Sequence, residues 1–504
     1  MSMGPLLFRA DASVAIGTGH VMRCLALAQA WQDVGGAAIF AMANGTSAIY
    51  RRVTAESCQL EDISAQAGTA ADALRTVELA RQSRSEWIAV DGYQFGEDYQ
   101  RALKDRGLKV LLLDDYGHAA RYVADVVLNQ NVSARNSLYG NRSPETRLLL
   151  GPRYCLLRRE FSAWQSWKRE VPAIGRRVLV TMGGSDVENV TAQAMDALSR
   201  IGTEGLEAWV VVGGSNPRAE MLEQLANASG KRISLCRDVA NIAELMAWAD
   251  VAVSSAGTTC WELCLMAVPS LLVDVAANQT ALATEMGRRG CAIHLGGPND
   301  FVPGQLAEEV EELLGSESRR RCLSTRCREL VDGRGAQRVV LTMTGKLRLR
   351  AARAGDCRLL WDWANDPQVR AAAFSSEPIP WESHQVWFKD KMKDSRCSML
   401  VAEDHLGRRV GQFRVDWRSD SEGDIDVSVA AEFRGAGNGA ALIDSAVGCV
   451  FAERGESLHA FVKVENQASR RAFEQAGFAS LGEECVNGHQ AIHYVRRNEM
   501  AIDK

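Results

Sequence analysis

A glycine-rich segment near the start of the chain contains the first residues that could carry out chemistry. Gly17 and Gly19 precede His20, and the segment separates an apolar run at 5–8 from an amphipathic run at 21–31. Glycines let a backbone approach a ligand closely, and the start of a helix offers free N–H groups to a phosphate. An imidazole beside such a ligand can accept a proton at neutral pH. The segment predicts a phosphate-bearing ligand with His20 as general base.

Two further strand-to-helix turns lie in the middle of the chain and suit a nucleotide. They contain, in order, Gly184, Ser185, Gly257, Thr258 and Thr259. Backbone N–H groups and hydroxyls in such turns bind phosphate oxygens. Glu262 lies about one helical turn beyond the second of them, where it could accept two hydrogen bonds from a ribose diol. These residues predict a nucleotide pocket.

A third glycine-rich loop lies near the end of the chain. Arg434 begins an R-x-x-G-x-G run that separates an expected strand at 424–429 from an expected helix at 440–451. Successive N–H groups in such a loop form a nest for a pyrophosphate. No βαβ unit with a following ribose carboxylate surrounds the loop, so it is not a dinucleotide fingerprint.

Composition excludes several classes of function. The 504 residues carry a net charge of -5, which argues against a nucleic-acid partner. No apolar run approaches the roughly 20 residues of a membrane span, and 1–9 lacks a signal-peptide layout, so we expect a cytoplasmic protein. The 13 cysteines show no zinc spacing, and no DxD-type pair lies near the nucleotide turns. We therefore expect no metal; the oligomeric state is not indicated.

The elements that position these residues fall into three domains. In the first two-thirds of the chain, short continuous apolar runs alternate with helical patterns, which is typical of parallel strands covered on both faces. Changes of pattern at 164–177 and 345–355 place domains at 1–168, 169–345 and 346–504. The fold class is α/β: two doubly wound parallel-sheet domains followed by an α+β domain. A cleft between two such halves is a natural ligand site.

The segment from Arg9 to Leu25, with its IGTGHVMRC run, resembles the UDP-sugar hydrolase of pseudaminic acid biosynthesis. That family is GT-B-like, and the resemblance covers about residues 6–340. It implies that His20 activates a water that attacks the anomeric carbon. Asp91 and Tyr93 match an Asp-x-Tyr at a strand end and would orient His20 or hold a sugar hydroxyl. Further residues that the resemblance places against the nucleotide or sugar are Val239, Glu262, Asn278 and Gln279. The role of Asp114 and Asp115, at another strand end, stays open between capping and function.

The loop at 434–439 resembles the acetyl-CoA loop of GNAT acetyltransferases, and the likeness covers about residues 347–500. It implies acetyl-CoA as co-substrate. The residues expected to bind it are Val427, Val429, Arg434, Gly435, Gly437, Asn438, Gly439, Asn466 and Ser469. Phe473 departs from the family, since many members have a tyrosine there as general acid. Asp426 and Glu432 are candidates for the general base.

Together the two resemblances imply a bifunctional enzyme acting on a UDP-amino-sugar. The second part would acetylate the amino group of the sugar, and the first would hydrolyse the resulting UDP-2,4-diacetamido-2,4,6-trideoxy-altropyranose to free sugar and UDP. One alternative is a GT-B glycosyltransferase with a fused acetyltransferase, in which a sugar or lipid acceptor replaces water. Another is a non-catalytic sugar-nucleotide sensor, which the intact His20 and the loop at 434–439 disfavour. The stereochemistry of the sugar is not encoded in these motifs.

Overall fold

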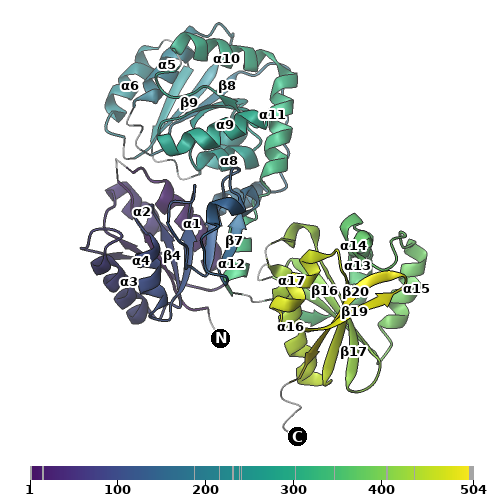
Figure 1. The fold of residues 1–504 in the computed structure, drawn as a ribbon. Coiled ribbons are helices and arrows are strands. Elements are labelled where there is room, and N and C mark those ends of the chain that lie inside the picture. The colour runs from purple at the N-terminus through teal and green to yellow at the C-terminus, as the bar shows by residue number, and fades with distance from the viewer. Residues whose placement is uncertain are drawn as a thin grey trace. The chain divides into compact units, whose positions relative to one another are not determined.

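The chain forms two units, Met1–Val340 and Leu341–Lys504, in the computed structural model. The structure describes residues 3–498 except 14, 15, 185, 187, 215, 230, 231, 238, 240, 301, 345, 346, 405, 406 and 436. Figure 1 shows two sheets in the first unit and one in the second. Among the described residues, no helix is both long and apolar enough to cross a membrane.

The first sheet is parallel throughout, in the order β3-β2-β1-β4-β5-β6-β7. Its strands are β1 (Leu6–Ala10), β2 (Ala38–Met42), β3 (Gln59–Asp62), β4 (Trp87–Asp91), β5 (Lys109–Leu113), β6 (Val126–Asn129) and β7 (Arg147–Leu150). The connecting helices are α1 (Gly19–Asp33), α2 (Ser47–Ala55), α3 (Ala70–Ser83) and α4 (Glu97–Lys104). Every residue of β1, β2 and β4 is buried, which explains why their sequences read as unbroken apolar runs.

The second sheet is also parallel, in the order β10-β9-β8-β11-β12-β13. Its strands are β8 (Arg177–Thr181), β9 (Glu207–Val212), β10 (Arg232–Arg237), β11 (Val251–Ser255), β12 (Ser270–Val273) and β13 (Ile293–His294). Its helices are α5 (Val190–Arg200), α6 (Ala219–Ala228), α7 (Ile242–Trp248), α8 (Thr259–Leu265), α9 (Thr280–Arg288), α10 (Pro303–Gly315) and α11 (Glu317–Leu330). Helix α12 (Gly335–Thr344) then returns to the first half, where Arg338 donates to the Arg153 carbonyl. The two sheets confirm the predicted pair of doubly wound domains.

The second unit has the α+β pattern predicted for it. Its sheet runs β14-β15-β16-β17-β18-β20-β19, and only β17 and β18 pair in parallel. The strands are β14 (Arg348–Ala351), β15 (Cys397–Glu403), β16 (Arg409–Trp417), β17 (Glu422–Val429), β18 (Ser457–Lys463), β19 (Ala479–Val486) and β20 (His489–Arg497). The helices are α13 (Cys357–Ala364), α14 (Pro367–Ala372), α15 (Trp381–Lys391), α16 (Asn438–Glu453) and α17 (Gln467–Gln475).

A buried ion pair ties β1 to α3 beneath the glycine-rich loop. The Arg9 guanidinium donates to both oxygens of Asp72 at 2.9 and 3.1 Å, and neither side chain has exposed surface. Arg9 also lies 2.9 Å from Asp11, whose other oxygen accepts the N–H groups of Ala43 and Asn44. The end of β1, from which the loop departs, is thus fixed by charged hydrogen bonds.

Removing Asp72 should destabilise the first unit, because the buried Arg9 would lose both hydrogen bonds to its bidentate partner and keep only Asp11 as a counter-charge. We expect Asp72→Ala to lose about 3–5 kcal/mol of unfolding free energy, measured by urea denaturation. Glu78→Ala removes the exposed partner of Arg75 and should cost no more than about 1 kcal/mol. Equal losses in the two variants would contradict the assigned importance of the buried pair.

Candidate active site

A cavity of about 580 Å³ lies at the carboxyl ends of strands from both sheets of the first unit. This volume falls in the range of small-ligand pockets, and this position is where doubly wound sheets bind ligands. The predicted residues that line it are Gly17, Gly19, His20, Tyr93, Gly184, Val239, Gly257, Thr258, Thr259, Glu262, Asn278 and Gln279. Asp91 lies behind His20, and Ser185 is outside the described residues. Turns far apart in sequence therefore meet at one cavity.

His20 stands in the first turn of α1 with its ring held by a carboxylate. Its Nδ1 lies 2.6 Å from Oδ1 of Asp91, the last residue of β4, whose side chain is fully buried. Burial alone would raise the pKa of Asp91, but the charges and hydrogen bonds of Arg23 and His20 hold that pKa well below its usual range. Since a carboxylate only accepts, Nδ1 carries the proton and donates it. The lone pair of Nε2 is then the one that can take a proton from a substrate.

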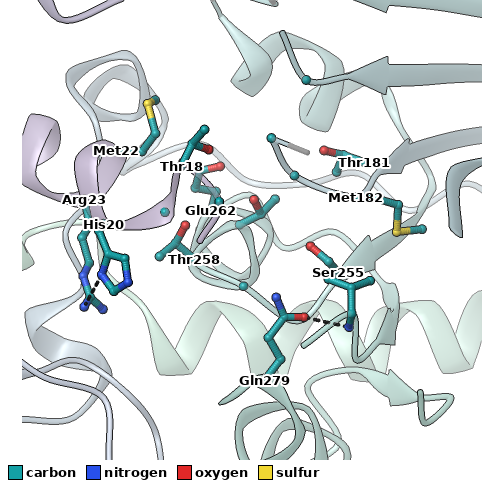
Figure 2. Close-up of a pocket in the computed structure, with 18 of the residues that line it drawn as sticks. Thr18, His20, Met22, Arg23, Thr181, Met182, Ser255, Thr258, Glu262 and Gln279 are labelled. Atoms are coloured by element: carbon teal, nitrogen blue, oxygen red, sulfur yellow. Dashed lines mark hydrogen bonds between the residues drawn. The ribbon is translucent and has the colours of Figure 1, made fainter. Parts of the chain in front are cut away.

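Arg23 organises the acidic groups around His20, and sequence reasoning assigned it no role. Its guanidinium contacts Asp91 at 2.6 and 2.7 Å and Asp115 at 2.7 and 3.1 Å. Asp115 also accepts a 2.8 Å hydrogen bond from the Tyr93 hydroxyl. His20 and Arg23 are three residues apart on one helix, and this spacing was the available signal that both face the same site. Figure 2 shows the two side chains next to each other.

The two neighbouring aspartates after β5 have different surroundings: Asp114 is bonded within its own turn, whereas Asp115 faces the cavity. Asp114 accepts the backbone N–H groups of Asp115, Tyr116 and Gly117, and the Tyr122 hydroxyl at 2.5 Å. Asp114 therefore holds the turn after β5. Asp115 instead lines the cavity and contacts Arg23.

Three contacts join the two halves of the first unit around the cavity. The Asn278 amide donates to the Tyr93 hydroxyl at 3.0 Å. Arg158, which sequence reasoning missed, donates to Glu262 at 2.8 Å. A Cβ at Gly184 would lie 2.6 Å from the Thr18 hydroxyl oxygen, so the Thr18 side chain packs directly against the glycine of the other turn. Figure 2 shows Thr18, Thr258 and Glu262 around this space.

The predicted acetyl-CoA residues of the second unit surround the place where β17 and β18 separate. The two strands pair only through Glu422–Ser457, Gly423–Leu458 and Asp424–His459. Val427 and Val429 lie on the part of β17 beyond this pairing. Gly435 and Gly437 both have φ of +76°, which favours glycine, and Gly437 caps α16. A gap between parallel strands that ends at a helix N-terminus suits an extended ligand with a terminal pyrophosphate.

Several of the side chains predicted to bind acetyl-CoA make hydrogen bonds within the protein. Arg434 donates to the Val429 carbonyl at 2.8 Å and to Asp366 at 2.8 Å. Asn438 is buried, and its side chain donates to the Phe433 carbonyl. Asn438 could therefore contact a ligand through its backbone N–H group rather than through its side chain. Asn466 caps α17 by accepting the Ser469 N–H. Gly439 packs beneath α17, where a Cβ would lie 3.4 Å from Ala472.

Three residues of the second unit bear on proton transfer in the sequence: Phe473, Asp426 and Glu432. Phe473 is buried and stacks on Tyr494, with 6.0 Å between ring centroids. Asp426 accepts from Gln412 at 3.0 Å and its side chain is 55% exposed. Glu432 is exposed. Among the residues that the structure describes, no cluster of three or more His, Cys, Asp or Glu could hold a metal ion.

Two segments of the chain match known domain families. Residues 177–328 match the glycosyltransferase family 28 C-terminal domain, and residues 346–479 match the acetyltransferase (GNAT) domain. The first match agrees with the nucleotide half of a GT-B-like pair. The second confirms the expected GNAT unit and its use of acetyl-CoA.

Three relatives align with the chain at low identity. The UDP-2,4-diacetamido-2,4,6-trideoxy-beta-L-altropyranose hydrolase of Campylobacter jejuni is 26% identical over 56% of this chain and 97% of its own length. An uncharacterized protein of Methanocaldococcus jannaschii, MJ1062, is 21% identical over 84% of this chain and 86% of its own. The spore coat polysaccharide biosynthesis protein SpsG of Bacillus subtilis is 26% identical over 46% of this chain and 68% of its own.

The hydrogen bonds to Asp114 predict a pH-dependent contribution to stability. Burial opposes the shift, but the His118 ring 3.3 Å away and hydrogen bonds from Tyr122 and the backbone lower the pKa of Asp114 to about 2. A lowered folded-state pKa stabilises the fold above about pH 4, and this contribution of about 2–3 kcal/mol is lost as the pH falls through 4 towards 2. Asp114→Asn should therefore lower the melting temperature at pH 7, and its difference from wild type should shrink between pH 4 and pH 3.

Differential scanning fluorimetry across this pH range would measure the effect. Asp105→Asn, which changes an exposed aspartate on the same domain, is the control and should leave the melting temperature unchanged at every pH. A wild-type-to-Asp114→Asn difference that stays constant from pH 7 to pH 3 would rule out the hydrogen-bonded carboxylate as its cause.

Proposed function

We propose that this chain, which joins a region similar to UDP-sugar hydrolases to a GNAT acetyltransferase domain, catalyses two reactions on one nucleotide sugar. The GNAT unit acetylates the amino group of a UDP-amino-sugar. The first unit then hydrolyses the acetylated product, UDP-2,4-diacetamido-2,4,6-trideoxy-altropyranose, to UDP and free sugar. We place both reactions in the cytoplasm.

The hydrolysis rests on one observation above all, the buried Asp91 that orients His20 at a cavity. In the proposed reaction, His20 Nε2 takes a proton from a water molecule whose oxygen attacks the anomeric carbon. The bond between that carbon and the diphosphate oxygen breaks with inversion, and UDP leaves. Asp91 stabilises the imidazolium that forms, as an oriented carboxylate does for a catalytic histidine.

The UDP group would lie against the second half of the unit. We assign the diphosphate to the facing glycine-rich turns, with Thr258 and Thr259 as hydroxyl donors. Glu262 would accept the ribose hydroxyls while the hydrogen bond from Arg158 holds its carboxylate in place. Val239 is assigned to the uracil, and Asn278 and Gln279 to the sugar. The similarity to the C. jejuni hydrolase, over 97% of the length of that protein, supports this choice of substrate.

The acetylation would take place in the second unit, in the gap between β17 and β18. We assign the pantetheine arm to the edge of β17 at Val427 and Val429, and the pyrophosphate to the loop at Gly435 and Gly437. The product of this reaction carries the second acetamido group of the proposed hydrolase substrate. The two activities would therefore be consecutive.

Replacing His20 should stop hydrolysis without stopping acetylation. We expect His20→Ala to reduce UDP release from the diacetamido substrate by about 10²–10⁴-fold, the usual contribution of a general base. CoA release in the presence of acetyl-CoA and the UDP-amino-sugar should persist. His294→Ala is the matched control, because His294 also pairs with an aspartate, Asp274 at 3.0 Å, but is not among the residues that line the cavity.

The same assay separates the hydrolase from a glycosyltransferase. Hydrolysis requires UDP release from the purified chain with water alone. Release that begins only after a sugar or lipid acceptor is added would replace the proposal by glycosyl transfer. Release at the wild-type rate from His20→Ala would remove His20 from the mechanism.

Altering the glycine-rich loop of the second unit should weaken acetyl-CoA binding without affecting hydrolysis. Gly437→Ala adds a side chain where φ is +76°, so we expect acetyl-CoA to bind at least about tenfold more weakly in calorimetry. UDP release from the already acetylated substrate should stay at the wild-type rate. Gly448→Ala, in the interior of α16 where a Cβ meets nothing within 4 Å, is the control and should preserve both properties. Unchanged acetyl-CoA binding by Gly437→Ala would contradict the assigned loop.

A further inference from the structure

A continuous chain of hydrogen bonds crosses three neighbouring strands of the second unit. The Ser457 hydroxyl lies 3.1 Å from His459 Nε2, and His459 Nδ1 lies 2.9 Å from His493 Nε2. His493 Nδ1 then lies 2.7 Å from Glu484 Oε1. These residues belong to β18, β20 and β19, and no sequence motif marked them.

The chain begins at the apex of the gap between β17 and β18. Asp424 and His459 form the last pair of the short parallel ladder. Beyond them, across the described residues 425–429 and 460–463, the two strands have no ladder pairing. Leu458 and Ala460 belong to the hydrophobic core, so alternation along the strand puts His459 on the opposite face. His459 is therefore next to the part of the gap assigned to acetyl-CoA and away from buried Phe473.

The carboxylate of Glu484 fixes one end of this hydrogen-bond chain, because it only accepts and His493 therefore donates from Nδ1. In the arrangement that leaves His459 a basic nitrogen, His493 Nε2 accepts from His459 Nδ1. The Nε2 lone pair of His459 faces the Ser457 hydroxyl. Burial lowers the pKa of His459, and the charge of Arg418 lowers it further, against the opposing effect of Glu422 and Asp424. His459 is thus neutral at pH 7 and has a basic nitrogen.

We propose that His459 is the general base of acetyl transfer, oriented by His493 and Glu484; this rests on the proposed acetyltransferase function. His459 Nε2 exchanges the Ser457 hydroxyl for the ammonium group of the acceptor and takes one proton from it. The amine nitrogen bonds to the acetyl carbonyl carbon as the carbon–sulfur bond to CoA breaks. A second proton from that nitrogen goes to the CoA thiolate. The proton on His459 leaves to solvent near Glu484, whose side chain is 52% exposed.

Kinetics of the full chain with acetyl-CoA and the UDP-amino-sugar test the base. We expect His459→Gln to lower kcat for CoA release about 100-fold or more at pH 7, with acetyl-CoA affinity within twofold of wild type. The wild-type rate should level off above the pKa of the histidine, whereas the variant rate should keep rising with pH as free amine accumulates. His489→Gln, on β20 outside the hydrogen-bond chain, should match wild type.

A second pair of variants tests the orienting carboxylate. Glu484→Gln should reduce kcat about tenfold and displace the pH profile, because the imidazolium loses its charged partner. Glu483→Gln, the adjacent glutamate, should do neither. Equal kcat and pH profile in His459→Gln and wild type would overturn the assignment of the base while leaving the acetyltransferase intact. Absence of CoA release from wild type with this acceptor would overturn both.

Nitrogen NMR of histidine-labelled full chain gives a readout that needs no substrate. The proposal expects both His459 and His493 to carry a proton on Nδ1 and none on Nε2 at pH 7, in contrast to the Nε2 form that free neutral histidine favours. Protons on Nε2 of both rings would overturn the proposed direction of the hydrogen bonds.

Discussion

The geometry of the first unit depends on a single buried carboxylate. Asp91 has no exposed side-chain surface and joins two groups of α1, the His20 ring and the Arg23 guanidinium. A buried charge is tolerated only when it is fully paired, so the positions of β4 and α1 are fixed relative to each other. The hydrogen bond to Asp91 also determines which nitrogen of His20 carries the proton. Through Arg23, the same network of hydrogen bonds reaches Asp115 and Tyr93. The interactions that orient the His20 ring are therefore the same ones that hold α1 against β4.

Most of the fold could be predicted because buried parallel strands leave a clear pattern. The apolar runs at 87–90, 110–113 and 251–253 all became central strands, since a strand covered on both faces must be apolar at every position. The glycine-rich turns were equally clear in the sequence, because each lies between a strand and a helix. The division between an α/β part and an α+β part followed from the same patterns.

The contacts around the predicted residues could not be read in the same way. Arg23 meets carboxylates 68 and 92 positions away, and Arg158 meets Glu262 across 104 positions. Such pairs depend on which strand ends face each other, and the identity of the residues alone does not encode that. Asn438 shows a second limit of the sequence. It was predicted to bind the ligand, but its side chain donates to the Phe433 carbonyl within the same loop. The histidine pair of the second unit comes together only through the antiparallel register of β18 and β20.

The contact between Gly184 and Thr18 sets the clearance between the two halves of the first unit. On one side of this point a Cβ would strike the threonine, and behind it a Cβ at Gly213 would lie 2.4 Å from the Gly184 carbonyl oxygen. The Gly184 turn is therefore packed between the Thr18 side chain on one side and the Gly213 backbone on the other. A redesign of the cavity for bulkier sugars has a second place to enlarge it along α2, where Ala48 and Arg51 form part of the wall. At the contact itself, Thr18 is the side chain to shorten, whereas any side chain added at Gly184 or Gly213 would strike its neighbours.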